Sequence, residues 1–407
     1  MSLTFRETEL DNGLRIIAEV EPTAHTAAAG FFVKAGTRDE ALQDMGVSHF
    51  LEHMMFKGSS RRSADEVNRD FDDLGANYNA YTSHEMTCFY GSVLPEHLPP
   101  LVEILGDILR PALRDADFNA EKKVILEEIA MYRDHPFWTL YESAIAEYYG
   151  EHALGYRVLG TDESITTMPI ERMRTYFDTR YSPDNTVIAL AGKMDFDAVV
   201  GQIAQQCGHW TRTGARRAAP RPATNLGELS LRDAKVTRGY LLMLAPAPAA
   251  QDEDRYAAML LSRVLGDADN SRLHWALVEG GIAEEAQAAY EPRDGCGDYY
   301  IYASGDPERL PEIREVIRRE VAGLVDSLKQ DDLERLCNTL ATSVTLAGER
   351  PGGRMQRLGR YWTYLGKYMT LEEELAQIQG LTLDDLRAVA QRFPLTPHLI
   401  AQLLPAS

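Results

Sequence analysis

Hydrophobic and polar positions along the first half of the chain follow two kinds of pattern. Short alternating or continuous apolar runs predict strands, at residues 5–10, 14–18, 27–33, 77–81, 86–94 and 185–191. Where apolar positions recur every three to four residues, the pattern predicts helices, at residues 47–57, 64–74, 99–109, 118–132, 139–149, 171–177 and 195–206. Strands and helices are therefore grouped along the chain and do not strictly alternate.

The second half of the chain, which follows a change in composition, again has its predicted strands and helices in groups. Residues 211–227 are rich in Arg, Pro, Ala and Gly and lack apolar periodicity, which predicts a linker. Beyond it the predicted elements are strands, at residues 239–244, 286–290 and 299–303, and helices, at residues 257–265, 310–328, 331–347, 355–368 and 383–393. We therefore predict an α+β fold of two domains, residues 1–210 and 228–407, each an antiparallel sheet packed with helices.

Composition and charge narrow the possible partners. The chain has 407 residues, is 44% hydrophobic and carries a net charge of −20. A surface of that sign repels phosphate backbones and anionic headgroups, so we expect neither nucleic acid nor a membrane as a partner. No apolar stretch approaches the roughly 18–20 residues that cross a bilayer, and the first residues are too polar for a secretory signal. The four cysteines stand far apart in the sequence, which favours buried free thiols over a disulfide framework. Free thiols are typical of a reducing compartment, so we expect a cytoplasmic protein.

One short segment carries candidate chemistry, since residues 48–56 read Ser-His-Phe-Leu-Glu-His-Met-Met-Phe. Positions four apart lie on one face of a helix, so His49 and His53 can direct both imidazoles at one metal ion. Glu52 projects beside them, and the order H-x-x-E-H is the inverzincin signature. Two imidazoles and a carboxylate favour zinc over magnesium or calcium, which prefer oxygen ligands. The alternative is a helix whose histidines pack in the core or face solvent.

A third ligand is expected from another helix, because a catalytic zinc normally takes three protein ligands. The predicted helix at 118–132 offers Glu128, whose neighbours three and four positions away are hydrophobic or aromatic. A carboxylate on such a stripe is costly to bury unless a cation compensates it. Glu121 lies seven positions earlier, which returns it to nearly the same face. The alternative for Glu128 is a partly exposed acid at the edge of the stripe.

With these motifs the chain resembles the M16 (pitrilysin) family of zinc peptidases, which includes mitochondrial processing peptidase, pitrilysin and insulin-degrading enzyme. Its length is that of the short bacterial members. The resemblance is strongest at residues 49–58, at the Asn-Ala-Tyr-Thr run of residues 79–82 and at the acids within residues 121–128. It implies two related α+β domains with the processing-peptidase-like metallohydrolase fold.

The resemblance also implies roles for the motif residues. His49, His53 and Glu128 would bind Zn²⁺, and Glu52 would be the general base that takes a proton from the zinc-bound water. Glu121, which matches a supporting acid of the family, would be a further catalytic residue. The activity implied is that of a zinc metalloendopeptidase, a metalloprotease that hydrolyses short or unfolded peptides.

Substrate and partner follow from the same resemblance. Asn79 and Ala80 would belong to an edge strand along which the peptide substrate binds in extended form. The second half departs from the family, because Val278 stands where Arg is expected and Glu284 where Tyr is expected. Neither can stabilise a developing oxyanion. We therefore expect a second M16-like subunit to supply that pair in a heterodimer, with a homodimer as the alternative.

Two other function classes remain open. A non-catalytic or assembly subunit of a processing-peptidase-like complex would not need the intact H-x-x-E-H motif and its downstream acid. Another hydrolase or lyase with an H-x-x-E-H site would need no second domain.

Overall fold

The computed structural model describes residues 3–217 and 222–406, which form two compact units. Unit 1 consists of residues 1–129, 156–218 and 345–369, and unit 2 of residues 130–155, 219–344 and 370–407, with the undescribed residues left aside. Each unit therefore contains a segment from the other half of the chain.

Unit 1 is built on a six-stranded sheet with the order β1-β2-β6-β3-β5-β4. Its strands are β1 (Thr4–Glu9), β2 (Arg15–Val20), β3 (Ala27–Val33), β4 (Asn77–Thr82), β5 (Thr87–Val93) and β6 (Thr186–Gly192). Its helices are α1 (Val47–Met55), α2 (Ala64–Asp73), α3 (Leu98–Ile108), α6 (Asp162–Thr167), α7 (Ile170–Arg180), α8 (Phe196–Cys207) and α12 (Pro351–Leu365). It also contains α4 (Asp115–Arg133) up to residue 129. Only β2 and β6 pair in parallel. β4 ends the sheet and pairs with β5 alone.

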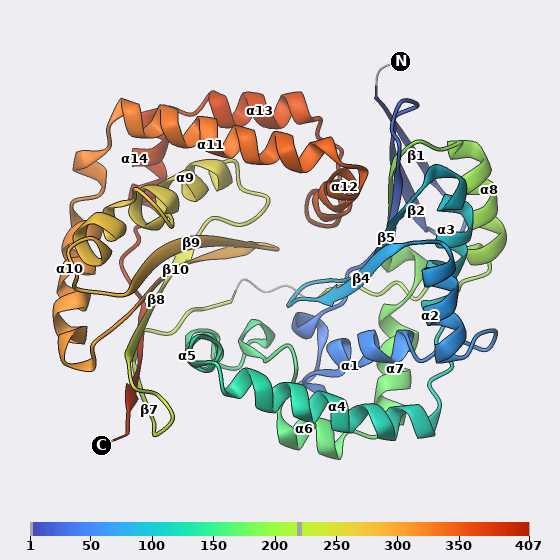
Figure 1. Cartoon of the computed structure of the whole chain (residues 1–407), viewed down its shortest axis with the longest axis horizontal. Coiled ribbons are helices and arrows are strands. Elements are labelled where there is room, and N and C mark those ends of the chain that lie inside the picture. The colour runs from blue at the N-terminus through green and yellow to red at the C-terminus, as the bar shows by residue number, and fades with distance from the viewer. Residues whose placement is uncertain (1–2, 218–221, 407) are drawn as a thin grey trace. The chain divides into compact units, whose positions relative to one another are not determined.

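Both faces of this sheet are covered, which explains why every residue of β3 is buried. The helices α3 and α8 lie on one side of the sheet and α12 on the other (Figure 1). Side chains of β3 alternate between the two faces, and Phe32 points to α12. A Cβ atom at Gly359 of α12 would lie only 2.1 Å from the Phe32 ring, so the glycine permits this close approach.

Unit 2 contains a five-stranded sheet with the order β7-β11-β8-β10-β9. Its strands are β7 (Gly227–Asp233), β8 (Gly239–Ala247), β9 (Glu285–Arg293), β10 (Cys296–Gly305) and β11 (Leu399–Pro405). Its helices are α5 (Pro136–Tyr149), α9 (Arg255–Gly266), α10 (Leu310–Ala322), α11 (Gln330–Glu349), α13 (Leu371–Gln379) and α14 (Leu383–Arg392). The pairing of β7 with β11 is parallel and the others are antiparallel.

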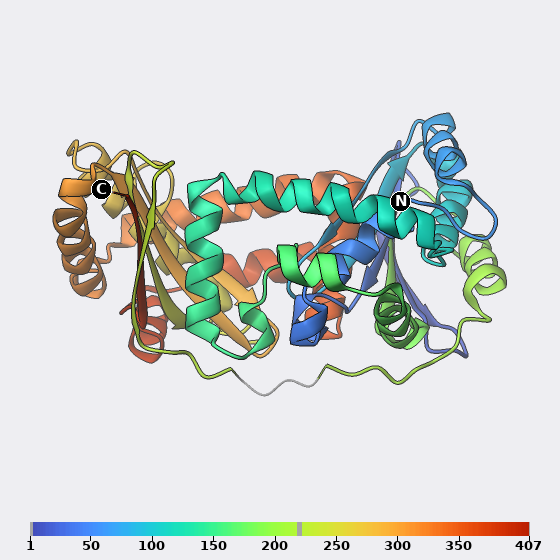
Figure 2. The same ribbon diagram turned by 90° about the horizontal axis from the view of Figure 1, so that it is seen from below.

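Alternate residues of β8 divide the interior of unit 2 into two layers. Leu241 and Met243 pack with α9 and α10, whereas Leu242 and Leu244 pack with α5. Figure 2 shows α5, in teal, running alongside the sheet. A buried group fixes α5 there, because the Tyr149 hydroxyl donates to Asp298 at 2.6 Å.

The predicted α+β fold with two mostly antiparallel sheets is confirmed. Among the named strands and α-helices of the described residues, four were not predicted, namely β7, β11, α6 and α13. The helix predicted at 310–328 ends at Ala322 with Gly323 as its C-cap, and a separate short turn follows at Val325–Ser327. The domain boundaries predicted at 210 and 228 stay a prediction.

Residues 211–217 of the predicted linker are held to unit 1 by Arg217, which donates to Asp39 at 2.7 Å. Residues 218–221 of the linker lie outside the described part of the chain. Among the described helices, none is long and apolar enough to cross a membrane.

Candidate metal centre

Helix α1 carries the H-x-x-E-H motif, and its packing fixes the orientation of the motif side chains. Phe50, Leu51 and Met54 are fully buried and hold one face of the helix in the interior of unit 1. His49 and His53 lie one turn apart on another face, with ring centroids 4.6 Å apart. The apolar positions of α1 therefore determine where the two imidazoles point.

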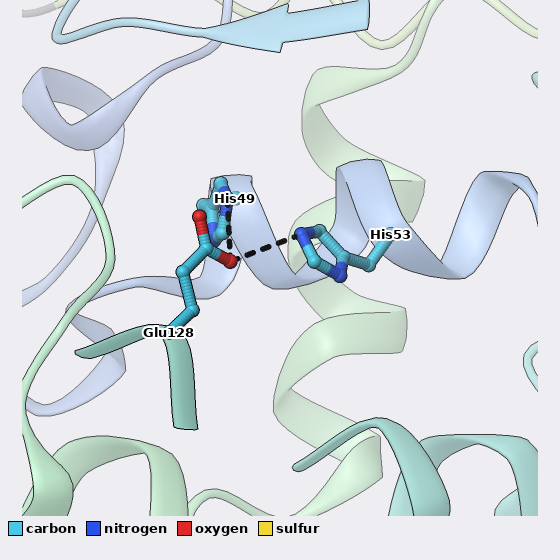
Figure 3. A group of neighbouring side chains, drawn as sticks. All are labelled: His49, His53 and Glu128. Atoms are coloured by element: carbon cyan, nitrogen blue, oxygen red, sulfur yellow. Dashed lines mark ion pairs between the residues drawn. The ribbon is translucent and has the colours of Figure 1, made fainter. Parts of the chain in front are cut away.

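The third residue of the group comes from α4. Glu128 Oε2 lies 3.8 Å from His49 Nε2 and 3.6 Å from His53 Nε2. Figure 3 shows the carboxylate of Glu128 facing both imidazoles across the gap between the helices. One ligand atom from each of the three residues lies within 4.8 Å of the others, so the structure brings the three predicted ligands together.

The donor set and its spacing fit a zinc ion. Ligand atoms at about 2.0–2.1 Å from a tetrahedral zinc lie about 3.3 Å from one another, close to the separations found here. Burial, together with the neighbouring His53, lowers the pKa of His49 to about 3, so this imidazole is neutral, as a metal ligand must be. Burial raises the pKa of Glu128, a cost that a bound cation would offset.

Glu121 stands behind His53 and does not face the gap between the ligands. Its Oε1 lies 2.9 Å from His53 Nδ1, so the other ring nitrogen, Nε2, is the one left to face Glu128. Lys57 Nζ lies 2.6 Å from the second oxygen of Glu121. Burial raises the pKa of Glu121, but the bonds from Lys57 and His53 outweigh it and the net pKa is lowered. A charged carboxylate therefore orients His53.

Glu52 is held by Thr82, a residue to which the sequence assigned no role. Thr82 Oγ1 donates to Glu52 Oε2 at 2.6 Å. Burial raises the pKa of Glu52, and the bond from Thr82 opposes this rise. Thr82 lies on the Asn-Ala-Tyr-Thr run, but a contact between residues thirty positions apart leaves no periodic signal in the sequence. The position of Lys57 was a weak indication that it lies near the site, because it follows His53 by one helical turn.

Asn79 and Ala80 lie on β4, the strand that ends the unit 1 sheet. Asn79 is exposed, and its Oδ1 accepts a hydrogen bond from the backbone N–H of Ala80 at 2.8 Å. β4 ends at Thr82, which contacts Glu52. The predicted substrate strand and the predicted base are therefore in direct contact.

The two departures from the family pattern lie in unit 2. Val278 ends a short π-helical turn, His274–Val278, and packs against the interior of the unit. Glu284 is exposed and pairs with Arg238 at 2.5 Å. Arg272 and Tyr290 lie nearby in the sequence and could offer donors in their place, but Arg272 contacts Ser327 and the Tyr290 hydroxyl donates to Pro248 O at 2.9 Å.

Comparison with known proteins places this chain in a family. Residues 15–162 match the family described as insulinase (peptidase family M16), and residues 167–340 match the peptidase M16 inactive domain. An "uncharacterized zinc protease" of Streptomyces coelicolor is 32% identical over 398 residues, which cover 95% of this chain and 87% of that protein. The chain belongs to peptidase family M16.

Other proteins are similar to this chain in sequence or in fold. A protein of Bacillus subtilis, also named an "uncharacterized zinc protease", is 30% identical over 97% of both chains. A protease from Helicobacter pylori, with a solved structure, has a TM-score of 0.91 at 19% identity and covers 100% of both chains. A putative M16-like peptidase from Alicyclobacillus acidocaldarius has a TM-score of 0.85 at 22% identity, covering 100% of this chain and 99% of that one. The predicted family is confirmed.

Proposed function

We infer that this M16 chain is a zinc-dependent endopeptidase that hydrolyses short or unfolded peptides. The observation that carries this proposal is the convergence of His49, His53 and Glu128, with a second acid, Glu52, on the same helix as the histidines. The names of the relatives in Streptomyces and Bacillus agree with it.

Each residue of the site has a separable task in this reaction. A zinc ion held by His49, His53 and Glu128 would polarise the scissile carbonyl and lower the pKa of a bound water toward about 7. Glu52 accepts the proton of the attacking water and delivers it to the leaving amine. Thr82 occupies one carboxylate oxygen of Glu52, which leaves the other free to take that proton.

The substrate is expected to bind along β4. An edge strand has backbone N–H and C=O groups without partners in its own sheet, and an extended peptide can pair with them. Asn79 and Ala80 would contact the peptide in this way, and the contact of Thr82 with Glu52 would place the bound peptide beside the general base. Folded proteins offer no such free strand, so short or unfolded peptides are the substrates expected.

A second M16-like subunit is part of the proposal. Val278 and Glu284 offer no donor for an oxyanion, and Arg272 and Tyr290 are engaged elsewhere in unit 2. A heterodimer in which the other chain supplies an Arg and a Tyr accounts for this departure, and a homodimer is the alternative. The cytoplasmic location also stays a prediction.

The proposal is tested by incubating the purified chain with an unstructured peptide and following cleavage by mass spectrometry. We expect cleavage at internal bonds that stops after chelation and returns when zinc is added back. A chain that binds zinc but cleaves nothing, with or without its co-purified partner, would instead be a non-catalytic or assembly subunit. Strong cleavage by the isolated chain would contradict the need for a second subunit.

Glu121 provides a milder prediction within the same site. Glu121→Gln is expected to weaken zinc binding by about 10–100-fold, because the amide no longer holds His53 and Lys57 as a carboxylate does. Competition with a chromophoric chelator measures the affinity. Glu127→Gln, which changes an exposed acid on the same helix, is the matched control and should leave the affinity unchanged. Equal affinities for both variants would remove Glu121 from the site.

A further inference from the structure

The first turn of α1 lacks the side-chain cap that helices usually have. Its N-cap residue is Gly46, in the left-handed conformation with φ of 91°. A Cβ atom at this position would lie 2.7 Å from the backbone oxygen of Leu159. A capping Ser, Thr, Asp or Asn therefore cannot stand there, and the N–H groups of the first turn need an acceptor from elsewhere.

Glu40 supplies that acceptor from outside the helix. Its Oε2 accepts from the backbone N–H of Gly46 and its Oε1 from that of Ser48, both at 2.8 Å. The side chain is buried, and its negative charge lies at the positive end of the helix dipole. Both carboxylate oxygens are therefore used to hold one turn of helix.

Tyr176 ties the same turn to α7. Its hydroxyl lies 2.7 Å from Ser48 Oγ and 3.2 Å from the backbone oxygen of Gly36. Tyr176 is itself buried, so these contacts are shielded from water. The first turn of α1 is therefore held both at its backbone and at a side chain.

His49 depends on this turn more than His53 does. The N–H of Phe50 donates to the carbonyl oxygen of the N-cap residue Gly46 at 3.0 Å, so the N–H of His49 lies before the first donor of the helical ladder. Glu52 and His53 lie one turn later, inside it. Loosening of the first turn would move His49 away from Glu128 and leave His53 in place.

We propose that Glu40 and Tyr176 are positioning residues that fix His49 for metal binding by holding the first turn of α1. The inference rests on the proposed zinc site. Burial raises the pKa of Glu40 to about 7, against the two backbone hydrogen bonds that lower it, so the test is made at pH 8. Neither residue touches the ligand atoms of the site, so their effect is exerted through the backbone of α1.

Zinc affinity of the full chain, measured by competition with a chromophoric chelator, tests the proposal. We expect Glu40→Gln to weaken zinc binding by about 10–100-fold, the usual effect of removing a group behind a metal ligand. Tyr176→Phe should weaken it by a smaller factor. Asp195 caps α8, a helix without ligands, by accepting from Ala198 N–H at 3.1 Å. Asp195→Ala is therefore the matched control, and its zinc affinity should equal that of the wild type.

The absorption spectrum of the cobalt-loaded protein is a second readout, because it reports ligand geometry and does not follow overall stability. We expect shifted bands in Glu40→Gln and Tyr176→Phe and none in Asp195→Ala. A folded Glu40→Gln variant with wild-type zinc affinity and spectrum would overturn the proposal. If that variant does not fold, wild-type values for Tyr176→Phe would overturn it. Absence of zinc binding by the wild-type chain would instead refute the proposed function.

Discussion

Glu52→Gln is expected to leave the zinc content of the protein unchanged and to lower the rate of peptide cleavage by about 10²–10⁴-fold. Glu52 is not one of the three residues whose ligand atoms converge, so its replacement removes no metal ligand. Gln keeps the size of the side chain and can still accept the hydrogen bond from Thr82. It cannot take a proton from water, so the loss should appear in kcat with little change in KM.

Zinc content by atomic emission and peptide cleavage by mass spectrometry, on the same preparation, decide this prediction. Glu127→Gln serves as the control, because it also exchanges one acid for its amide but at an exposed position on α4. Turnover by Glu52→Gln at the wild-type rate would show that another group is the base. Loss of zinc from this variant would show that Glu52 contributes to the metal site itself.

Residues of the site that follow from local spacing could be predicted from the sequence. His49 and His53 are one helical turn apart, and Glu121 and Glu128 are two turns apart, so the helical period alone puts each pair on one face. That these two faces meet could be expected only from the chemistry of a zinc site or from the family resemblance. The structure brings the three predicted ligands together, while the roles assigned to them stay predictions.

Contacts between distant segments could not be predicted in this way. Thr82 is thirty positions from Glu52, and Tyr176 is 128 positions from Ser48. Such pairs depend on the sheet order and on how α1 packs against β4 and α7, and no period along the chain encodes either. The residues that hold the site in place are therefore less visible in the sequence than those that would bind the metal.

The same distinction applies to the fold. The strong apolar periods predicted most helices and strands, but β7 was not predicted, because its residues are mostly exposed at the edge of a sheet. The helix predicted at 355–368 corresponds to α12, yet nothing local indicates that it covers the sheet of unit 1. Its position depends on contacts between distant segments, such as the close approach of Gly359 to Phe32.

Glu128→Gln is expected to weaken zinc binding by more than about a hundredfold. Replacing a residue that only supports a ligand costs up to about a hundredfold in affinity, and a residue that is itself a ligand should cost more. Its carboxylate provides the only negative charge among the three converging groups, and an amide would leave the ion with two neutral imidazoles. Glu127→Gln, one position earlier and exposed, should bind zinc as the wild type does. The two variants share composition and charge, so any difference between them reports the position on α4.

Thermal or urea unfolding with and without zinc gives a second measure of zinc binding, as the gain in the free energy of unfolding. At a free zinc concentration about 1,000 times the wild-type Kd, bound zinc adds about 4 kcal/mol to the free energy of unfolding. With a hundredfold weaker site at that concentration, the gain falls to about 1.4 kcal/mol. Equal stabilisation of Glu128→Gln and Glu127→Gln would mean that the carboxylate facing His49 and His53 is not a metal ligand.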